Sequence, residues 1–334
     1  MSSSRQQLKA TVFAALHAGE PFVIPNPWDA GSARMLEALG FAALATTSSG
    51  LAFTLGRLDG GATLEEVCTH VAELDPLTEL PISADLENGY GARPEDAAKA
   101  IRRAAEAGAV GGSIEDWDPE RGLYEREQAI ERVHAAAETA HGLGFAFMLT
   151  ARAENHIRRN PNLDDTIERL QAFQAVGADV LYAPGLRSVA EIRVVCEAVS
   201  KPVNVLAVPQ LTVAQIMAAG AQRISVGGAL TWVAAKAAAD AATAMRDSGD
   251  LFGARRAAAA RALARHQRLV DQIVAMLAVA IENPGGIGAE NLSLACSSLR
   301  TEPRMTPDRT NWRAFVTMCG ETPSGGLTCG TLVE

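Results

Sequence analysis

Short apolar runs alternate along the first 230 residues with alanine-rich stretches whose apolar residues recur at helical spacing. Ile130, Val133, Ala137 and Ala140, for example, would form one stripe of a helix. The apolar runs predict strands near residues 21–27, 42–48, 81–87, 111–116, 145–152, 180–184, 202–207 and 223–227. A helical stretch follows each of them, so the pattern predicts eight strands alternating with helices.

A glycine stands at five of the predicted joints between a helix and the next strand. These are Gly40, Gly108, Gly144, Gly177 and Gly220. Glycine accepts the left-handed conformation that commonly ends a helix, so each of these residues predicts a helix terminus.

Eight such units predict an α/β fold whose parallel strands close into a (β/α)8 TIM barrel. The alternative is a doubly wound open sheet, which needs fewer strands and usually carries a glycine-rich nucleotide loop after the first of them. The segment from Pro25 to Asp29 occupies that position and contains no such loop. The sequence therefore favours the barrel.

The barrel is expected to occupy residues 1–282. Additional C-terminal helices are predicted between residues 229 and 281, with a break at Ser248 and Gly249. Beyond residue 282 the chain is rich in Gly, Pro, Ser and Thr, and residues 283–334 are predicted to form an irregular C-terminal tail.

Composition narrows the classes of function. The 334 residues carry a formal net charge of −9, which argues against a nucleic-acid partner, since phosphate backbones are bound by clustered Lys and Arg. No apolar run is long enough for a membrane span. The five cysteines include no CxxC pair, as expected for reduced thiols in the cytoplasm.

Acidic residues gather where the predicted strands end, which is the face where barrel enzymes carry their chemistry. Asp85 and Glu87 would project from the same side of an extended strand, and Glu115 ends the next strand. Neighbouring carboxylates repel unless a cation separates them or one of them stays protonated. A divalent metal is the simplest cation to propose: Mg²⁺ prefers oxygen ligands, with Mn²⁺ as an alternative ion. Two simpler interpretations stay open: a solvated strand end, and an ion pair between Glu115 and Arg152.

Other residues at this rim suit an anionic ligand. Arg152, which ends the fifth strand, could make a forked contact with a carboxylate or phosphonate, or could neutralise the acidic residues. Asn204 could hydrogen-bond a ligand or simply end its strand, and Trp28 follows the first strand.

A glycine-containing turn follows the second strand. The backbone amides of Ser49, Gly50 and Leu51 could hold an anion there, although an ordinary loop fits equally well. Asp59 lies in a further turn, with no role beyond that turn required.

None of the four lysines ends a predicted strand, so a Schiff-base aldolase would have no nucleophile. Metal-assisted chemistry on a small 2-oxo or 2-hydroxy acid remains, in which the metal would stabilise an enolate.

Several motifs, taken together and in order, resemble the isocitrate lyase and phosphoenolpyruvate mutase superfamily over about residues 8–280. They are Pro27-Trp28-Asp29-Ala30-Gly31-Ser32-Ala33-Arg34, Ser49-Gly50-Leu51 followed by Asp59, Asp85-Leu86-Glu87-Asn88-Gly89-Tyr90-Gly91, Gly112-Ser113-Ile114-Glu115-Asp116 and Thr150-Ala151-Arg152.

The resemblance implies a Mg²⁺-dependent barrel that forms a homo-oligomer, dimer or tetramer, often with a swapped last helix. It also implies metal binding through Asp85, with Glu87 and Glu115 acting mostly through water. The Ser49–Leu51 amides would hold a substrate carboxylate, Arg152 the other anionic end, and Asp59 would assist the reaction.

Two departures from the family pattern bear on the reaction. Glu87 stands where family members commonly have Asp. The loop from Trp117 to Tyr124 lacks both the cysteine signature of the isocitrate and methylisocitrate lyases and the lysine and asparagine of the phosphonopyruvate branch. We therefore expect a lyase that cleaves or forms a C–C bond in a small 2-oxo or 2-hydroxy carboxylic acid. The alternatives are mutase- or hydrolase-type P–C chemistry on phosphonopyruvate, and an inactive barrel that binds a dicarboxylate.

Overall fold

The computed structural model describes residues 4–250. Its first compact unit runs to Thr243, and a second begins at Ala244. The predicted boundary at residue 282, the predicted helices beyond residue 250 and the predicted tail lie outside the described residues, so these stay predictions.

Eight parallel strands form one sheet, in the order β1-β10-β9-β8-β7-β4-β3-β2. The strands are β1 (Phe22–Ile24), β2 (Leu44–Ala45), β3 (Ile82–Asp85), β4 (Gly111–Glu115), β7 (Met148–Arg152), β8 (Val180–Tyr182), β9 (Val203–Leu206) and β10 (Arg223–Ser225). The first strand pairs with the last, Phe22 opposite Arg223, as an open doubly wound sheet would not allow. The predicted (β/α)8 barrel is confirmed.

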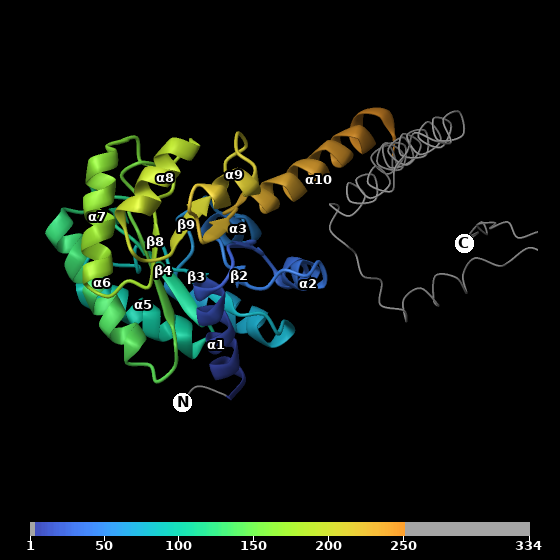
Figure 1. The fold of residues 1–334 in the computed structure, drawn as a ribbon. Coiled ribbons are helices and arrows are strands. Elements are labelled where there is room, and N and C mark those ends of the chain that lie inside the picture. The colour runs from blue at the N-terminus through green and yellow to red at the C-terminus, as the bar shows by residue number, and fades with distance from the viewer. Residues whose placement is uncertain (1–3, 251–334) are drawn as a thin grey trace, which may run out of the picture. The chain divides into compact units, whose positions relative to one another are not determined.

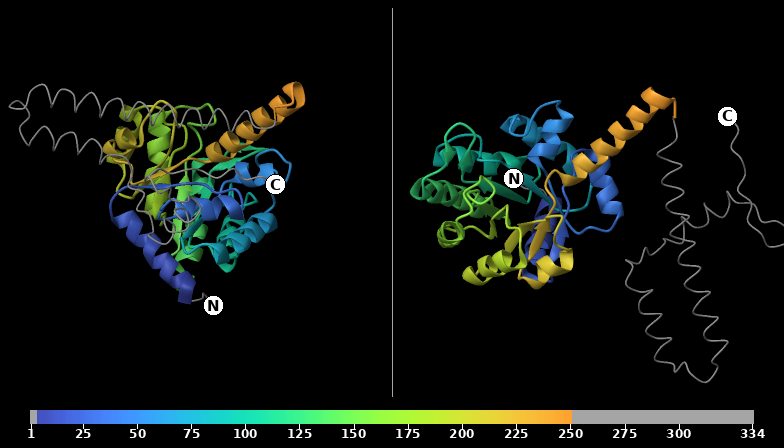
Figure 2. Two further views of the ribbon diagram at one scale, coloured as in Figure 1. Left: turned by 90° about the vertical axis from the view of Figure 1, so that its right-hand side faces the viewer. Right: turned by 90° about the horizontal axis from the view of Figure 1, so that it is seen from above.

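Helices follow the strands and surround them (Figures 1 and 2). They are α1 (Ser4–Ala18), α2 (Ala30–Ala38), α3 (Ser48–Thr54), α4 (Leu64–Leu74), α5 (Pro94–Glu106), α6 (Arg126–His141), α7 (Leu163–Ala175), α8 (Val189–Ala198), α9 (Val213–Ala218) and α10 (Ala229–Ser248), with a 3₁₀ turn at Asp75–Leu77. None of the helices in residues 4–250 is long and apolar enough to span a membrane.

The glycines that were predicted to end helices do so. The five predicted joint glycines all have positive φ, between 76° and 110°. Gly249, with φ of 68°, follows the last residue of α10, where a break was predicted. Side chains cap the starts of several helices: Asp29 accepts a hydrogen bond from the Ser32 amide at 2.7 Å before α2.

One side chain joins the two ends of the sheet at the rim where the strands end. Asn26, which is 4% exposed, donates to the carbonyls of Ala45 and Thr46 at 3.0 and 3.1 Å. Its side-chain oxygen Oδ1 accepts hydrogen bonds from the backbone amides of Val226 and Gly227, both at 2.9 Å. The segments after β1, β2 and β10 are thereby held together, next to the site described below.

Helix α1 lies at the opposite end, below the strands in Figure 1. Its Phe13 is fully buried and packs edge-on to His17, which in turn contacts the ring of Phe22. Gly111 leaves room for this helix, because a Cβ there would lie 2.7 Å from the Phe13 ring. The end where the strands begin is therefore closed by side chains, and the other end carries the cavity.

Candidate active site

A cavity of about 180 Å³ lies within the barrel and reaches the rim at the carboxyl ends of the strands. Five residues predicted from the sequence line it: Ser49, Asp59, Asp85, Arg152 and Asn204.

The other predicted residues lie around the cavity without lining it. They are Trp28, Gly50, Leu51, Glu87 and Glu115. The predicted rim residues thus lie in one region, but not all of them line the cavity.

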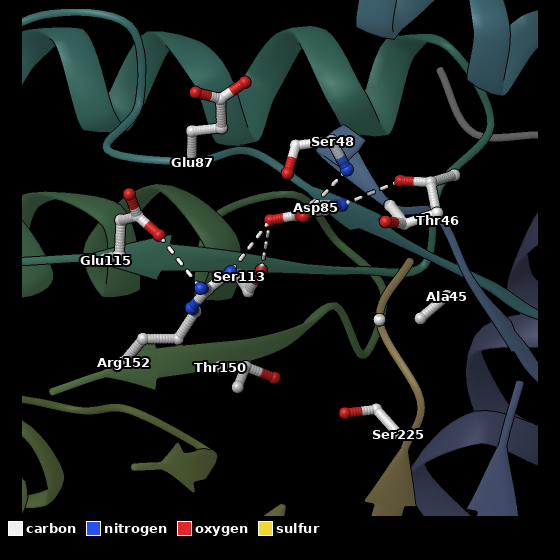
Figure 3. Close-up of polar contacts among 12 residues, drawn as sticks. Ala45, Thr46, Ser48, Asp85, Glu87, Ser113, Glu115, Thr150, Arg152 and Ser225 are labelled. Atoms are coloured by element: carbon white, nitrogen blue, oxygen red, sulfur yellow. Dashed lines mark hydrogen bonds and ion pairs between the residues drawn. The ribbon is translucent and has the colours of Figure 1, made fainter. Parts of the chain in front are cut away.

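Arg152, at the end of β7, is the cation around which the acidic residues are arranged (Figure 3). Its Nη1 lies 3.1 Å from Asp85 Oδ1, and its Nη2 lies 3.0 Å from Glu115 Oε2 and 2.8 Å from Glu154 Oε1. The Arg152 side chain is only 15% exposed, and these three charges hold its pKa well above the usual value despite burial. The ion pair between Glu115 and Arg152, considered above as an alternative, is therefore present.

Register explains why these groups meet. Asp85 ends β3 and is paired with Ser113 on β4, while Glu115, two residues further along β4, is paired with Arg152 on β7. Side chains two residues apart on a strand share a face, and paired residues lie about 5 Å apart. Adjacent strand ends therefore bring the three side chains together.

Asp85 is also fixed by neutral donors. The Ser48 amide donates to Oδ2 at 3.0 Å, and the Ser113 hydroxyl donates to Oδ1 at 3.3 Å. Its own amide donates to Thr46 Oγ1 at 2.8 Å. The carboxylate thus has a defined orientation at the cavity wall.

Glu87 differs from the sequence-based expectation. The sequence predicted an extended backbone that would project Glu87 from the same side as Asp85. Strand β3 instead ends at Asp85, and Glu87 adopts a φ of 46°, which is not extended. Glu87 nevertheless stays close to the end of β4, because its backbone carbonyl accepts a hydrogen bond from the Glu115 amide at 2.9 Å. Burial, followed by the charges of Asp85 and Asp59, raises the pKa of Glu87 to about 7.

Glu115 and Glu154 are buried at 7% and 1% exposure. Burial raises the pKa of Glu115 well above its usual value, although Arg152 acts in the opposite direction. Arg158, half-exposed, lies 3.6 Å from Glu115 and 3.2 Å from Glu154. The rim therefore holds four carboxylates and two guanidinium groups.

The glycine turn after β2 is the start of helix α3. The Leu51 amide donates to the Thr47 carbonyl at 3.0 Å, and that of Gly50 to Thr47 Oγ1 at 3.4 Å. The Ser49 amide has no partner among residues 4–250. Of the three amides predicted to hold an anion, only that of Ser49 is free to do so in this conformation.

The loop after β4 is a short hairpin of β5 (Trp117–Asp118) and β6 (Gly122–Leu123). Asp118 fixes its turn by accepting from the amides of Glu120 and Arg121, both at 2.9 Å. The guanidinium of Arg158 stacks on the Trp117 ring at 4.7 Å. Aromatic stacking and a capped turn thus occupy the place of the missing cysteine signature.

Sequence reasoning did not identify four residues of the site: Arg158, Tyr182, Arg223 and Ser225. The last three line the cavity. A signal was available for two of them, because Arg223 and Ser225 alternate with apolar residues and so share one face of their strand. Arg158 lies four residues after Glu154 in a segment that the strand pattern did not cover.

The donor chemistry of the rim fits a hard divalent cation. Asp85 and Glu87 offer carboxylate oxygens, and a cation beside them would offset the burial and the charge repulsion that raise the pKa of Glu87. Within residues 4–250, however, no three or more His, Cys, Asp or Glu side chains converge as a ready ligand set, since Asp85 and Glu115 both face Arg152. The site would therefore have to hold Mg²⁺ mostly through water, with one or two protein carboxylates, as this ion is commonly held in proteins.

Comparison with known proteins gives a consistent result. The model of the phosphoenolpyruvate phosphomutase family matches residues 13–246. An uncharacterised protein of Mycobacterium tuberculosis H37Rv is 32% identical over 237 residues, which are 70% of this chain and 88% of the relative. The 2-methylisocitrate lyase of Escherichia coli K12 is 28% identical over 200 residues, 57% of this chain and 66% of that enzyme.

Solved structures agree. A candidate lyase/mutase from Burkholderia cenocepacia J2315 is 48% identical, with a TM-score of 0.73 over 75% of this chain and 92% of that one. A candidate phosphonomutase from the same organism is 36% identical, with a TM-score of 0.68 over 71% and 98%. Oxaloacetate acetylhydrolase with its product oxalate is 27% identical, with a TM-score of 0.68 over 73% and 88%.

Proposed function

Because the chain belongs to the isocitrate lyase and phosphoenolpyruvate mutase superfamily, whose members act on small carboxylic acids, we propose that it is a Mg²⁺-dependent lyase. It would cleave or form a C–C bond in a small 2-oxo or 2-hydroxy acid, through an enolate. The observation that carries this proposal is the cavity into which Asp85, Arg152 and Ser49 face at the carboxyl ends of the strands.

Asp85 would hold the metal directly, and Glu87 and Glu115 through water. When bound, Mg²⁺ supplies a positive charge for the oxygen on which negative charge develops as the bond to carbon breaks. Ser48 and Ser113 orient the Asp85 carboxylate, and the Glu115 amide holds the backbone of Glu87 by donating to its carbonyl.

The substrate carboxylate would accept from the unpartnered Ser49 amide. Arg152 would offer a charged hydrogen bond to the anionic substrate, using the Nη1 group that now pairs with Asp85. Asp59, which lines the cavity, would assist near the reacting carbon. A relative that binds the product oxalate, oxaloacetate acetylhydrolase, has a ligand small enough for a cavity of this size.

P–C bond chemistry on a phosphonopyruvate-like acid is the second candidate. It is supported by the likeness to the candidate phosphonomutase, which is 36% identical over 98% of its length. The same rim would serve both reactions, because each needs an oxygen-bound metal and a cationic partner for an anion.

Turnover of a panel of 2-oxo and 2-hydroxy acids, with phosphonopyruvate included, tests the proposal. We expect Mg²⁺-dependent product from one short acid, and loss of turnover and of Mg²⁺-dependent oxalate binding in Asp85→Asn with the fold intact by circular dichroism. Asp240→Asn is the control, because Asp240 is exposed and, among residues 4–250, pairs with Lys236 alone, away from the cavity. Unchanged oxalate binding in Asp85→Asn would remove the metal site from the proposal.

A further inference from the structure

Arg223, the first residue of β10, places a buried positive charge deep in the cavity. The residue is 5% exposed, and it lines the same cavity as Asp85 and Arg152. Burial lowers its pKa to about 10, which leaves it charged at neutral pH.

Its hydrogen-bond partners are all uncharged. Nε donates to Asn204 Oδ1 at 2.9 Å, and Nη2 donates to Thr150 Oγ1 at 3.0 Å. Nη1 lies 3.1 Å from Nε2 of His17. His17 Nδ1 lies 2.8 Å from the Phe13 carbonyl, which makes Nδ1 the protonated nitrogen and Nε2 an acceptor.

His17 stays neutral in this place. Burial, followed by the charge of Arg223, lowers the pKa of His17 to about 3. No carboxylate within residues 4–250 forms an ion pair with Arg223. A guanidinium has five N–H groups, and three of those on Arg223 have partners in this part of the chain.

Arg152 and Arg223 differ in the charges that surround them. Three carboxylates surround Arg152, whereas Arg223 has none, although a buried charge is costly unless an opposite charge accompanies it. The protein therefore supplies opposite charges to Arg152 but none, within residues 4–250, to Arg223. Two N–H groups of Arg223 remain for an anion that enters the cavity.

We propose that Arg223 forms a carboxylate-binding subsite at the floor of the cavity, which takes the far carboxylate of a dicarboxylic 2-oxo or 2-hydroxy acid. The choice of acid rests on the proposed function, but the subsite itself does not. Ser225, two residues along the same strand and also at the cavity, is held by Asn204 Nδ2 at 3.0 Å and would extend the polar wall toward the rim.

Formate, the smallest carboxylate, is the probe for the subsite, titrated by calorimetry into the full-length protein with EDTA present so that no metal contributes. Arg223→Met should bind formate at least tenfold more weakly than the wild type, as expected for a lost charged hydrogen bond. Arg103→Met is the matched control, because it removes a guanidinium from a surface ion pair with Glu65, away from the cavity; its formate affinity should match the wild type. Equal formate affinity in the wild type and Arg223→Met overturns the subsite, even where that variant is less stable, since Arg223 would then only anchor His17.

A crystal of the wild type soaked in bromide gives a result that does not depend on the folding of any variant. An anomalous peak within hydrogen-bond distance of the Arg223 guanidinium supports the subsite, and its absence overturns it. With Mg²⁺ present, Arg223→Met should raise KM for dicarboxylic acids at least tenfold more than for pyruvate. An equal rise for both would overturn the substrate class, because it would show that Arg223 does not contact the carboxylate that pyruvate lacks. Absence of turnover in the wild type would contradict the proposed function alone.

Discussion

Replacing Arg152 by Met should destabilise the protein strongly and in a pH-dependent way. The substitution leaves Asp85, Glu115 and Glu154 without the cation that now lies 2.8–3.1 Å from each. Removing one partner of a buried ion pair costs about 3–5 kcal/mol. For a domain of this size that corresponds to a fall in Tm of roughly 6–20 °C.

The sign of the pH dependence follows from the carboxyl groups. Burial already raises the pKa of Glu115, and without Arg152 this carboxyl holds its proton in the folded state at pH values where the unfolded chain has lost it. The folded state then binds more protons than the unfolded state, so the stability of the variant falls as pH rises. The deficit relative to the wild type should therefore be smaller at pH 5 than at pH 8.

Thermal and urea unfolding at both pH values, in EDTA, measures this effect. Arg103→Met is the control: its side chain is 38% exposed and pairs with the exposed carboxylates of Glu65 and Glu106, so its loss should cost about 1 kcal/mol or less. A deficit for Arg152→Met that is equally large at pH 5 and pH 8 would refute the reasoning, because it would show that lost packing and not uncompensated charge is responsible.

The affinity for Mg²⁺ should fall as pH drops below about 7, because Glu87, with a pKa of about 7, must lose its proton to act as a ligand. Calorimetry at pH 6 and 8 tests this, and the same pH slope in Glu87→Gln would contradict it. Gly50→Ala should lower the free energy of unfolding by about 1–3 kcal/mol, since its Cβ would lie 2.6 Å from the Thr47 side chain and 2.8 Å from Thr231 Oγ1. Gly31→Ala in α2 is the control: its Cβ has room, so this substitution should raise the free energy of unfolding by up to about 1 kcal/mol. Urea unfolding of both variants tests this, and a similar change in both would contradict a role for close packing at Gly50.

The architecture could be predicted because it depends on local signals. Apolar runs gave the strands, and glycines such as Gly108 and Gly177 marked the helix ends with the positive φ that they adopt. Asp85 and Arg152, at strand ends, and Asn204, within its strand, were predicted to lie at one rim, and all three line the cavity.

The remaining details depend on contacts between distant residues. Glu87 leaves the extended conformation in a turn where Arg132 of α6 donates to the carbonyls of Asn88 and Gly91. Arg223 looked like an unremarkable strand residue because its partner His17 lies 206 positions earlier. Periodicity carries no information about either contact.

Pairing of the first strand with the last has a consequence for how the protein is made. At a synthesis rate of about 5–20 residues per second, roughly 10–40 s separate the emergence of β1 from that of β10, its ladder partner. Throughout that interval the nascent chain has an open seam and no closed pocket. The nascent protein therefore becomes able to bind a ligand only late in synthesis, when β10, which carries Arg223, pairs with β1 beside Phe22.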